Sequence, residues 1–314
     1  MEMDRELVEQ FQRTVSEIYC NYEKNDVLTS KEGRHLPSRS SIIDMIKELR
    51  RMMFPGYFGE ENMTNYVGDY YVGSHMNNIY RTLKEQIILA FTYCDEALAA
   101  EEAAARAEVI SREFITKVPQ IQEMLLKDVQ AGFDGDPAAH SKEDIIISYP
   151  GLFAIYVYRI AHELYIQDVP LIPRIMTEYA HSRTGIDINA GARIGEYFFI
   201  DHGTGVVIGE TTIIGDHVKI YQGVTLGGLS TRQGQALSGV KRHPTIEDNV
   251  TIYSGSSILG GDTVIGHDSV IGGNAFITSS VAPQTKVIVR TPEMTFKDTN
   301  KKQDDDMSSW VWEI

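Results

Sequence analysis

Histidine is the side chain whose ordinary pKa lies closest to neutral pH, and this sequence contains nine of them. His202 stands in the run IDHGTG, between an acid and residues too small to cover it. His243 follows two cations in the run KRHP. These two are the candidates for chemistry, although each alone is as readily a satisfied surface or core residue. His217 and His267, in the runs IGDH and IGHD, are expected to face solvent at turns.

The segment that carries these histidines has apolar residues six positions apart from about residue 184. Neither a helix of 3.6 residues per turn nor an alternating strand has this period, whereas a coil of short parallel strands with a turn every sixth residue does. Chance alignment in an aliphatic-rich sequence is the alternative, but glycines in step with the repeat argue against it. The repeated positions are Ile188, Ile194, Ile200, Val206, Ile208, Ile214, Ile220, Leu226, Ile246, Ile252, Ile258, Val264, Val270 and Phe276.

The residues before about 184 have apolar positions three or four apart, which predicts helices. One helix is expected to be capped by Ser41 and to stop at the run FPG, because proline lacks the amide and clashes with the preceding turn. Cys20 and Cys94 fall in helical segments and are expected to be buried thiols, which favours neither a disulfide framework nor a zinc cluster. The other predicted helices span 74–95, 96–118, 119–131, 150–168 and 171–182.

Charge and hydropathy exclude several classes of function. The chain has 314 residues, and subtracting 44 Asp and Glu from 29 Lys and Arg leaves a net charge of -15, so nucleic acid and anionic membranes would be repelled. No apolar run approaches the roughly 18 residues that cross a bilayer. The acidic start MEMDRELVEQ is unlike a signal peptide. We expect a cytoplasmic protein that binds neither nucleic acid nor membrane.

The hexads resemble those of the left-handed parallel β-helix acyltransferases, and longer motifs narrow the resemblance. The runs IDINAGARIG, IDHGTGVVIGET, VTLGG, RHP and ILGGD, preceded by DVQA, DPA and YRIAH, are similar to serine O-acetyltransferase over about residues 125–288. That family transfers acetyl from acetyl-CoA to L-serine, which gives O-acetylserine for cysteine synthesis. The resemblance implies an α+β fold in which an all-α part precedes a left-handed parallel β-helix.

The implied organisation has three parts. Residues 1–183 are expected to form a helical domain that serves oligomerisation and part of the serine site, residues 184–288 the catalytic β-helix, and residues 289–314 a flexible tail. A loop at 229–241 has no hexad and is expected to leave the β-helix. The family also implies a homotrimer, or a dimer of trimers, with active sites between neighbouring prisms.

Two residues match the family's catalytic pair. His202 matches the general base that takes the proton of the serine hydroxyl as the oxygen attacks the thioester. Asp187 matches the carboxylate that orients this histidine, and its place roughly one coil earlier predicts that it lies in the adjacent coil. A solvated acid at a corner of the prism is the alternative for Asp187.

Serine is a zwitterion, so its pocket needs groups of both signs. The resemblance implies that Asp136 and Asp201 face the ammonium, while Arg242 and His243 face the carboxylate, which the guanidinium fork can bind with two hydrogen bonds. A cap or turn before Pro137 is the alternative for Asp136.

The CoA arm is assigned by resemblance to other positions. Gly227 and Gly228 would leave room for the thioester, Ser254 matches a position on the CoA channel, and the loop at 229–241 is the expected flap. Acetyl-CoA is the implied co-substrate, and no metal is expected, because the sequence has no cluster of ligands with metal-binding spacing.

Further partners follow from the resemblance alone. Cysteine, isosteric with serine, is expected to act as a feedback inhibitor. The chain ends in Ile314, whose free carboxylate would enter the active site of O-acetylserine sulfhydrylase, although a tail that folds on its own surface is the alternative.

Other functions compete with this interpretation. The same coil could acetylate homoserine or a sugar, or could serve as a non-catalytic scaffold that regulates the sulfhydrylase. A metalloenzyme of the γ-carbonic anhydrase type would need a third converging histidine, which the contexts of His217 and His267 do not supply.

Overall fold

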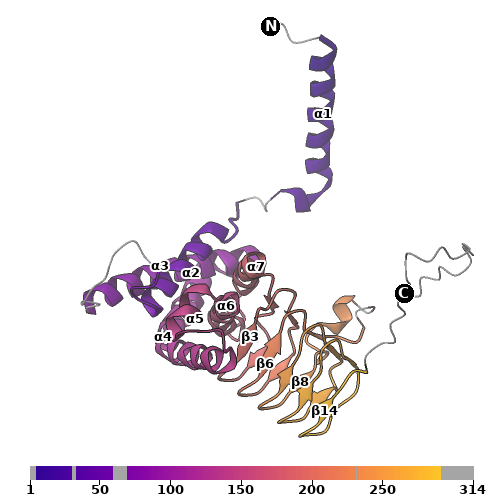
Figure 1. The fold of residues 1–314 in the computed structure, drawn as a ribbon. Helices are drawn as coiled ribbons and strands as arrows, with labels where there is room; N and C mark the ends of the chain where they lie inside the picture. The colour runs from indigo at the N-terminus through magenta and orange to yellow at the C-terminus, as the bar shows by residue number, and fades with distance from the viewer. Residues whose placement is uncertain (1–4, 30–32, 59–68, 231, 233, 291–314) are drawn as a thin grey trace, which may run out of the picture.

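The computed structural model describes residues 5–29, 33–58, 69–230, 232 and 234–290. Ile314 and the predicted tail beyond residue 290 lie outside the described residues. The first half is helical, with elements α1 (Arg5–Lys24), η1 (Asp26–Leu28), α2 (Arg39–Met53), α3 (Asp69–Cys94), α4 (Ala100–Gly135), α5 (Lys142–Ser148), α6 (Pro150–Tyr165) and α7 (Ile172–Thr184). Helices α2 to α7 gather at one end of a stack of strands, while α1 stands away from the other helices (Figure 1).

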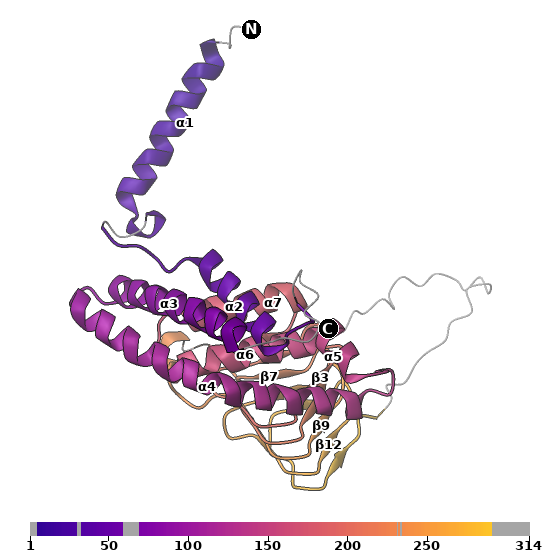
Figure 2. The same cartoon turned by 90° about the vertical axis from the view of Figure 1, so that its left-hand side faces the viewer.

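Helix α4 replaces two predicted helices with one. The helix runs through Pro119, where a break was predicted, and residues on both sides of the proline, Val118 and Ile121, are buried. Packing of this buried face against α3 and α6 outweighs the missing amide, because tertiary contacts override local propensity. The side view shows α4 as one long helix beside α3 and α6 (Figure 2).

Smaller helix predictions also need correction. Ser38, not Ser41, caps α2, since its side chain accepts a hydrogen bond from the backbone N–H of Ser41. The two cysteines are not buried: Cys20 is half-buried on the outlying helix α1, and Cys94 is exposed at the last residue of α3.

The second half is a parallel β-helix with three sheets, and this confirms the predicted fold class. We call the sheets A (β1-β4-β7-β10-β13), B (β2-β5-β8-β11) and C (β3-β6-β9-β12-β14). All recorded pairings are parallel. The strands are β1 (Asp187–Ile188), β2 (Arg193–Ile194), β3 (Phe199–Asp201), β4 (Val207–Ile208), β5 (Ile213–Ile214), β6 (Lys219–Tyr221), β7 (Thr225–Gly227), β8 (Thr245–Ile246), β9 (Thr251–Ile252), β10 (Ser257–Leu259), β11 (Val264–Ile265), β12 (Val270–Ile271), β13 (Phe276–Ile277) and β14 (Lys286–Val287).

The repeat of six accounts for the core of this prism. The predicted aliphatic positions from Ile188 to Ile258 are buried and stack in register from coil to coil, for example Ile208 on Leu226. The last three predicted positions are wrong by one residue, because the corner after Ile258 is one residue longer and a shift of one turns each side chain to the other face. Val264, Val270 and Phe276 point outward, and Ile265, Ile271 and Ile277 are buried in their place.

A buried ion pair joins the helices to the first coil. The Arg159 guanidinium on α6 binds the Asp128 carboxylate on α4, with Nε 2.6 Å from Oδ2, and both side chains are buried. Asp128 also accepts the backbone N–H of Phe198, and Arg159 donates to the carbonyl of Gly195. This network satisfies buried charges of both signs while it fixes α4 and α6 against the coil that carries β3.

No single helix in the described ranges has the length and apolarity to cross a membrane. The helices α5 and α6 reach that composition only together, and they are bent by 72° relative to each other. Much of α6 is buried within the protein.

Candidate active site

Two of the prism's three edges carry the residues singled out by the sequence. The edge that joins sheet C to sheet A, which we call the His202 edge, comprises corners 202–206, 222–224, 253–256 and 272–275. The edge that joins sheet A to sheet B, which we call the Arg242 edge, comprises corners 189–192, 209–212, 228–244 and 260–263.

His202 follows the end of β3 in a backbone conformation that few side chains adopt. Its φ is 57°, and the next residue, Gly203, has φ 88°. A Cβ at Gly203 would lie 2.4 Å from Cδ1 of Ile186, so the turn accepts only glycine there. The tight turn projects the imidazole away from the prism, where its side chain is 73% exposed.

Asp201 lies beneath this imidazole. Its Oδ1 is 3.8 Å from Nε2 of His202, and its Oδ2 is 3.7 Å from Nζ of Lys219 on β6. Lys219 also donates to the carbonyl of Gly135 at the end of α4. The nearly buried Asp201 carboxylate therefore has a cation on one side and the histidine on the other.

Asp136 comes to the same place from the helical part. It ends α4, and its Oδ2 accepts a 2.5 Å hydrogen bond from the hydroxyl of Tyr149, while Oδ1 accepts the backbone N–H of Ala138. The bond from Tyr149, followed by that from Ala138, lowers the pKa of Asp136. Burial, followed by the hydrogen bond to Asp136, raises the pKa of Tyr149 to about 12. Asp136 is thus an anion near Lys219 and His202, and it also makes the turn that the alternative interpretation expected.

Asp187 lies beside the His202 edge, but its carboxylate is grouped with residues of α7. The residue begins β1 beside the His202 edge, and its N–H donates to the carbonyl of Val206 in the next coil. Its carboxylate forms a group with Glu178 and His181 of α7, whose ligand-type atoms all lie within 4.8 Å of one another. The carboxylate recorded against His202 in the described chain is that of Asp201, not Asp187.

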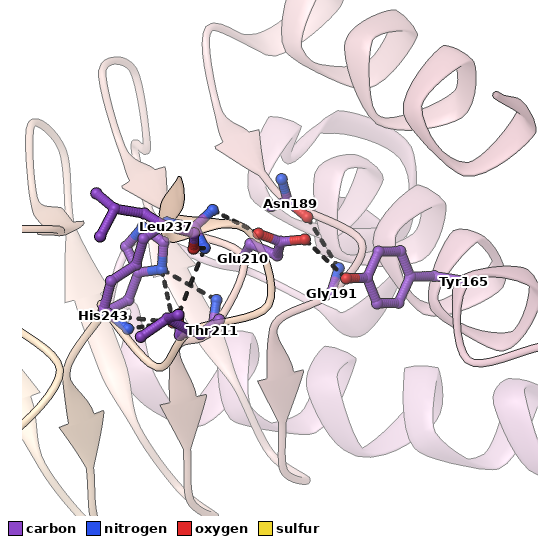
Figure 3. Close-up of polar contacts among 9 residues, drawn as sticks. Tyr165, Asn189, Gly191, Glu210, Thr211, Leu237 and His243 are labelled. Atoms are coloured by element: carbon purple, nitrogen blue, oxygen red, sulfur yellow. Dashed lines mark hydrogen bonds and ion pairs between the residues drawn. The ribbon is translucent and has the colours of Figure 1, made fainter. Parts of the chain in front are cut away.

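The Arg242 edge is built from a corner of the second coil and the base of the loop (Figure 3). The Arg242 guanidinium binds the Glu210 carboxylate and donates to the carbonyl of Leu237. Glu210 also accepts a 2.8 Å hydrogen bond from the hydroxyl of Tyr165 on α6. Burial acts to raise the pKa of Glu210, but the bonds from Tyr165 and Arg242 outweigh it and lower the pKa. The ionised Glu210 holds Arg242 in one orientation.

His243 is buried beside that guanidinium. Nδ1 of His243 lies 3.0 Å from the backbone N of Thr211 and accepts its hydrogen, so the ring proton belongs on Nε2. The Thr211 hydroxyl is 2.9 Å from the same Nδ1 and also accepts the backbone N–H of Arg242. Burial, followed by the charge of Arg242, lowers the pKa of His243 to about 4. His243 is therefore a neutral hydrogen-bond donor near pH 7.

The glycines and serine assigned to CoA do not share one edge. Gly227 ends β7 and Gly228 begins the corner of the Arg242 edge, where a Cβ on Gly228 would meet only the carbonyl of Arg242, at 3.5 Å. Ser254 lies on the His202 edge, two coils beyond His202 in the stacking order of sheet C. The open space at Gly228 fits the close approach of a ligand chain.

The structure thus groups the predicted site residues into two sets. Asp136, Asp201 and His202 meet at the His202 edge, and Arg242 and His243 meet at the Arg242 edge, with sheet A between them. Sequence analysis missed the residues that position them: Tyr149 and Lys219 stand in runs without a distinctive motif, and Glu210 and Thr211 end the run IDHGTGVVIGET, in which no role was assigned to them. The usable signals were the outward position of Lys219 in its hexad and the place of Glu210 and Thr211 at the end of that motif.

The other histidines of the coil have local partners. The His217 ring stacks on Tyr197 with 4.4 Å between centroids, and His267 pairs with Asp268 at 2.8 Å. These contacts agree with the predicted turn positions at the surface.

Known proteins resemble this chain in sequence and in structure. The plasmid serine acetyltransferase of Synechococcus elongatus is 43% identical over 237 residues, which cover 73% of this chain and 74% of that protein. Serine acetyltransferase of Bacillus licheniformis is 51% identical over 133 residues, or 42% of this chain and 59% of that protein. No protein-family model matches.

Solved structures extend the likeness over more of the chain. Entamoeba histolytica serine acetyltransferase 1 in complex with L-cysteine has a TM-score of 0.69 at 34% identity, and covers 83% of this chain and 90% of its own. Isoform 3 from the same organism, in complex with cysteine, has a TM-score of 0.70 at 31% identity, with coverage of 91% and 95%. Sequence identity over most of both chains, together with the shared architecture, shows that this protein belongs to the serine acetyltransferase family.

Proposed function

We propose that this protein transfers the acetyl group of acetyl-CoA to the hydroxyl of L-serine and so makes O-acetyl-L-serine and CoA. Its membership of the serine acetyltransferase family supports this activity. The observation that carries the mechanism is the split of the site into an acidic edge with an exposed imidazole and a cationic edge.

His202 is the proposed general base. A neutral imidazole accepts the hydroxyl proton as the serine oxygen attacks the thioester carbonyl, because an alcohol is a poor nucleophile at its own pKa. When the tetrahedral intermediate collapses, the C–S bond breaks and the imidazolium returns the proton to the CoA sulfur. The exposed ring, held out by the left-handed turn, is free to meet a substrate.

Carboxylates next to the ring stabilise the imidazolium that forms. Asp201 is already 3.8 Å from Nε2 of His202. For Asp187 we propose the orienting role that its place beside the same edge allows, which requires its carboxylate to turn from Glu178 and His181 toward the histidine.

The two edges suit the two ends of a bound serine. The ammonium would lie against Asp136 and Asp201, and the carboxylate against Arg242 and the Nε2 proton of His243. To bind the serine carboxylate, Arg242 either releases Glu210 or binds both carboxylates together. The hydrogen bond from Tyr165 keeps Glu210 ionised in both cases.

One chain holds these groups at different edges, so we infer that the site closes between two copies. In a cyclic trimer the His202 edge of one protomer meets the Arg242 edge of the next, and sheet A of each prism faces the threefold axis. The outward row of sheet A fits this placement, since after Asp187 in the first coil it is uncharged: Val207 and Phe276 are 38% and 72% exposed, and Thr225 and Ser257 lie between them. A dimer of such trimers remains a proposal for the helical part.

Acetyl-CoA would then reach the site along the seam. Gly227 and Gly228 from one edge and Ser254 from the other would border its chain, and the loop at 229–241 would cover it. Lys241 holds the base of this loop, because its Nζ donates to the carbonyls of Thr211 and Pro244 at 2.7 and 3.2 Å. Arg242 also donates to the carbonyl of Leu237 within this loop, so the loop and the Arg242 edge are linked.

Cysteine is the proposed feedback inhibitor. It keeps the ammonium and carboxylate of serine and replaces only the hydroxyl, so the same two edges would bind it. The complexes of the two Entamoeba enzymes with cysteine support this proposal. Binding of O-acetylserine sulfhydrylase through Ile314 is proposed from the resemblance alone.

An acceptor comparison tests the function. CoA release from acetyl-CoA is measured with L-serine, homoserine, threonine and a simple sugar, each with and without cysteine. We expect L-serine to give the highest kcat/KM and cysteine to raise its apparent KM. Faster release with homoserine or a sugar would overturn the assignment of the acceptor.

A further inference from the structure

A cavity lies in the helical part of the protein. Of the residues assigned above, only Tyr149 lines it. Its volume is about 490 Å³, within the range of small-molecule sites. The cavity lies among α2, α5, α6 and α7. Its lining residues are Lys47, Arg50, Arg51, Phe58, Ile147, Ser148, Tyr149, Pro150, Phe153, Tyr179, Arg183 and Thr184.

Among the described residues, the lining carries four cations, Lys47, Arg50, Arg51 and Arg183, and no carboxylate. Of these, Lys47 has an acidic partner, the exposed Asp44 at 3.0 Å. A concentration of positive charge is unexpected in a chain with a net charge of -15, and its local field favours an anion.

Arg50 is prepared for such a ligand. Its guanidinium carbon lies 3.6 Å from the centroid of the Phe58 ring and 4.9 Å from that of Phe153. Its guanidinium donates from Nη2 to the carbonyl of Ile146 at 3.4 Å. Burial lowers the pKa of Arg50, because it removes water from the charged guanidinium. A bound anion would offset this loss of hydration. A guanidinium fork matches the geometry of phosphate oxygens.

Aromatic rings form other walls of the cavity. Phe153 and Tyr179 meet edge to face with 6.1 Å between centroids, and Tyr149 is the N-cap of α6, one turn before Phe153. Rings and arginines together suit a ligand with a planar apolar part and an anionic part.

Tyr149 joins this cavity to the proposed serine site. Tyr149 lines the cavity, and its hydroxyl donates to Asp136 at 2.5 Å. A ligand that moves this ring would change the hydrogen bonding of the carboxylate proposed to face the serine ammonium.

We propose that the cavity binds a small organic phosphate with a planar base, of the size of a nucleoside monophosphate, and that its occupancy alters serine binding through Tyr149. The effect on serine binding rests on the proposed function, whereas the binding of the phosphate ligand is independent of it.

Calorimetric titration of the full-length protein tests the binding. AMP is the probe, with inorganic phosphate and adenosine as partial ligands. We expect saturable binding of AMP, weaker binding of phosphate and the weakest binding of adenosine. Reversing two exposed lining charges in R51E/R183E should weaken AMP binding at least about tenfold, since charge-assisted hydrogen bonds are lost. The control R13E/K24E reverses two exposed charges on α1 and should bind AMP as the wild type does.

Three results would overturn the binding proposal: no saturable binding of AMP at millimolar concentration, equal affinity in R51E/R183E, or competitive displacement of AMP by acetyl-CoA, which would place AMP in the CoA channel. The coupling is tested by serine KM, which AMP should change in the wild type and not in R51E/R183E. An unchanged KM at saturating AMP would overturn the coupling. Because calorimetry needs no turnover, failure of the acetyltransferase assignment would leave the binding result intact.

Discussion

The two edges beside sheet A carry the same residue type in opposite environments. His202 is 73% exposed at its side chain, stands on a left-handed turn and lies near the carboxylates of Asp201 and Asp136. His243 is 9% exposed, accepts a backbone N–H and lies beside the Arg242 cation. The first environment leaves the ring where a substrate can reach it, and the second keeps the ring neutral.

This difference assigns the base and the recognition of the ammonium to one edge, and the recognition of the carboxylate to the other. Acids near an imidazole stabilise the positive charge that appears on the ring only during the reaction. Interactions that form only in the transition state increase kcat. Cations that bind the substrate carboxylate act equally before and during reaction, so they change KM. Substitution of the base and substitution of the carboxylate-binding cation should therefore have separable kinetic effects.

Removal of the base should have the largest effect. His202→Ala should lower kcat by about 10² to 10⁴, the usual contribution of a general base, with little change in serine affinity. His243→Asn keeps an acceptor for the Thr211 N–H and should lose much less turnover. Steady-state kinetics with L-serine measures both, and a near-normal kcat in His202→Ala would remove this mechanism.

The cationic edge should respond in KM. Arg242→Ala removes charge-assisted hydrogen bonds worth about 1.5–3 kcal/mol, so serine KM should rise roughly 10- to 100-fold. Lys286→Ala, which removes an exposed cation on sheet C, is the matched control and should leave KM unchanged. Equal KM values for both variants would contradict the carboxylate assignment.

Much of this arrangement could be predicted from the sequence, and the failures have identifiable causes. The hexads predicted the inward residues correctly as far as Ile258, because each coil there returns one aliphatic to the axis. One extra residue in the next corner then moved Phe276 to the outside. Pro119 did not end α4, since packing of the buried face stabilises the helix.

For the site, local motifs were informative and distant partners were not. The runs IDHGTG and KRHP identified His202, Arg242 and His243, but nothing in them indicates that the two sets lie at different edges. Tyr149 and Glu210 reach the site from other segments of the chain, so their roles depend on the three-dimensional packing of α6 and the coil.

Tyr149 offers a smaller test of the acidic edge. Tyr149→Phe removes the hydrogen bond to Asp136 and should raise serine KM about 3- to 10-fold with kcat nearly unchanged, since one bond to a partly exposed charge is lost. Thr184→Val serves as the control, because it alters another lining position of the cavity in the helical part without removing a hydrogen bond to Asp136. A large fall in kcat in Tyr149→Phe would instead make the tyrosine part of the proton transfer.

The neutral state of His243 predicts the smallest effect, a pH-dependent loss of stability. The folded protein holds the pKa of His243 at about 4, whereas the unfolded chain has an ordinary value near 6.5. Between these values the unfolded state binds more protons, so the stabilisation is complete above about pH 6.5 and is lost as the pH falls toward 4.

Thermal melts at a series of pH values would measure this effect. Between pH 6.5 and 4, the melting temperature of His243→Asn should fall less than that of the wild type. The difference between the two falls should be about 2–4 °C for each kcal/mol of linked stability. Parallel curves for the two proteins would show that His243 is not held neutral by the fold.

The central claim is that each active site joins the His202 edge of one copy to the Arg242 edge of the next. Co-expression of His202→Ala and Arg242→Ala chains with different tags, followed by purification of mixed oligomers, tests it directly. In a mixed trimer of either composition, one of the three interfaces joins an intact His202 edge to an intact Arg242 edge, so mixed oligomers assayed at subsaturating serine should recover about a third of wild-type activity, well above either variant alone. Activity no higher than that of the two separate variants would contradict the claim.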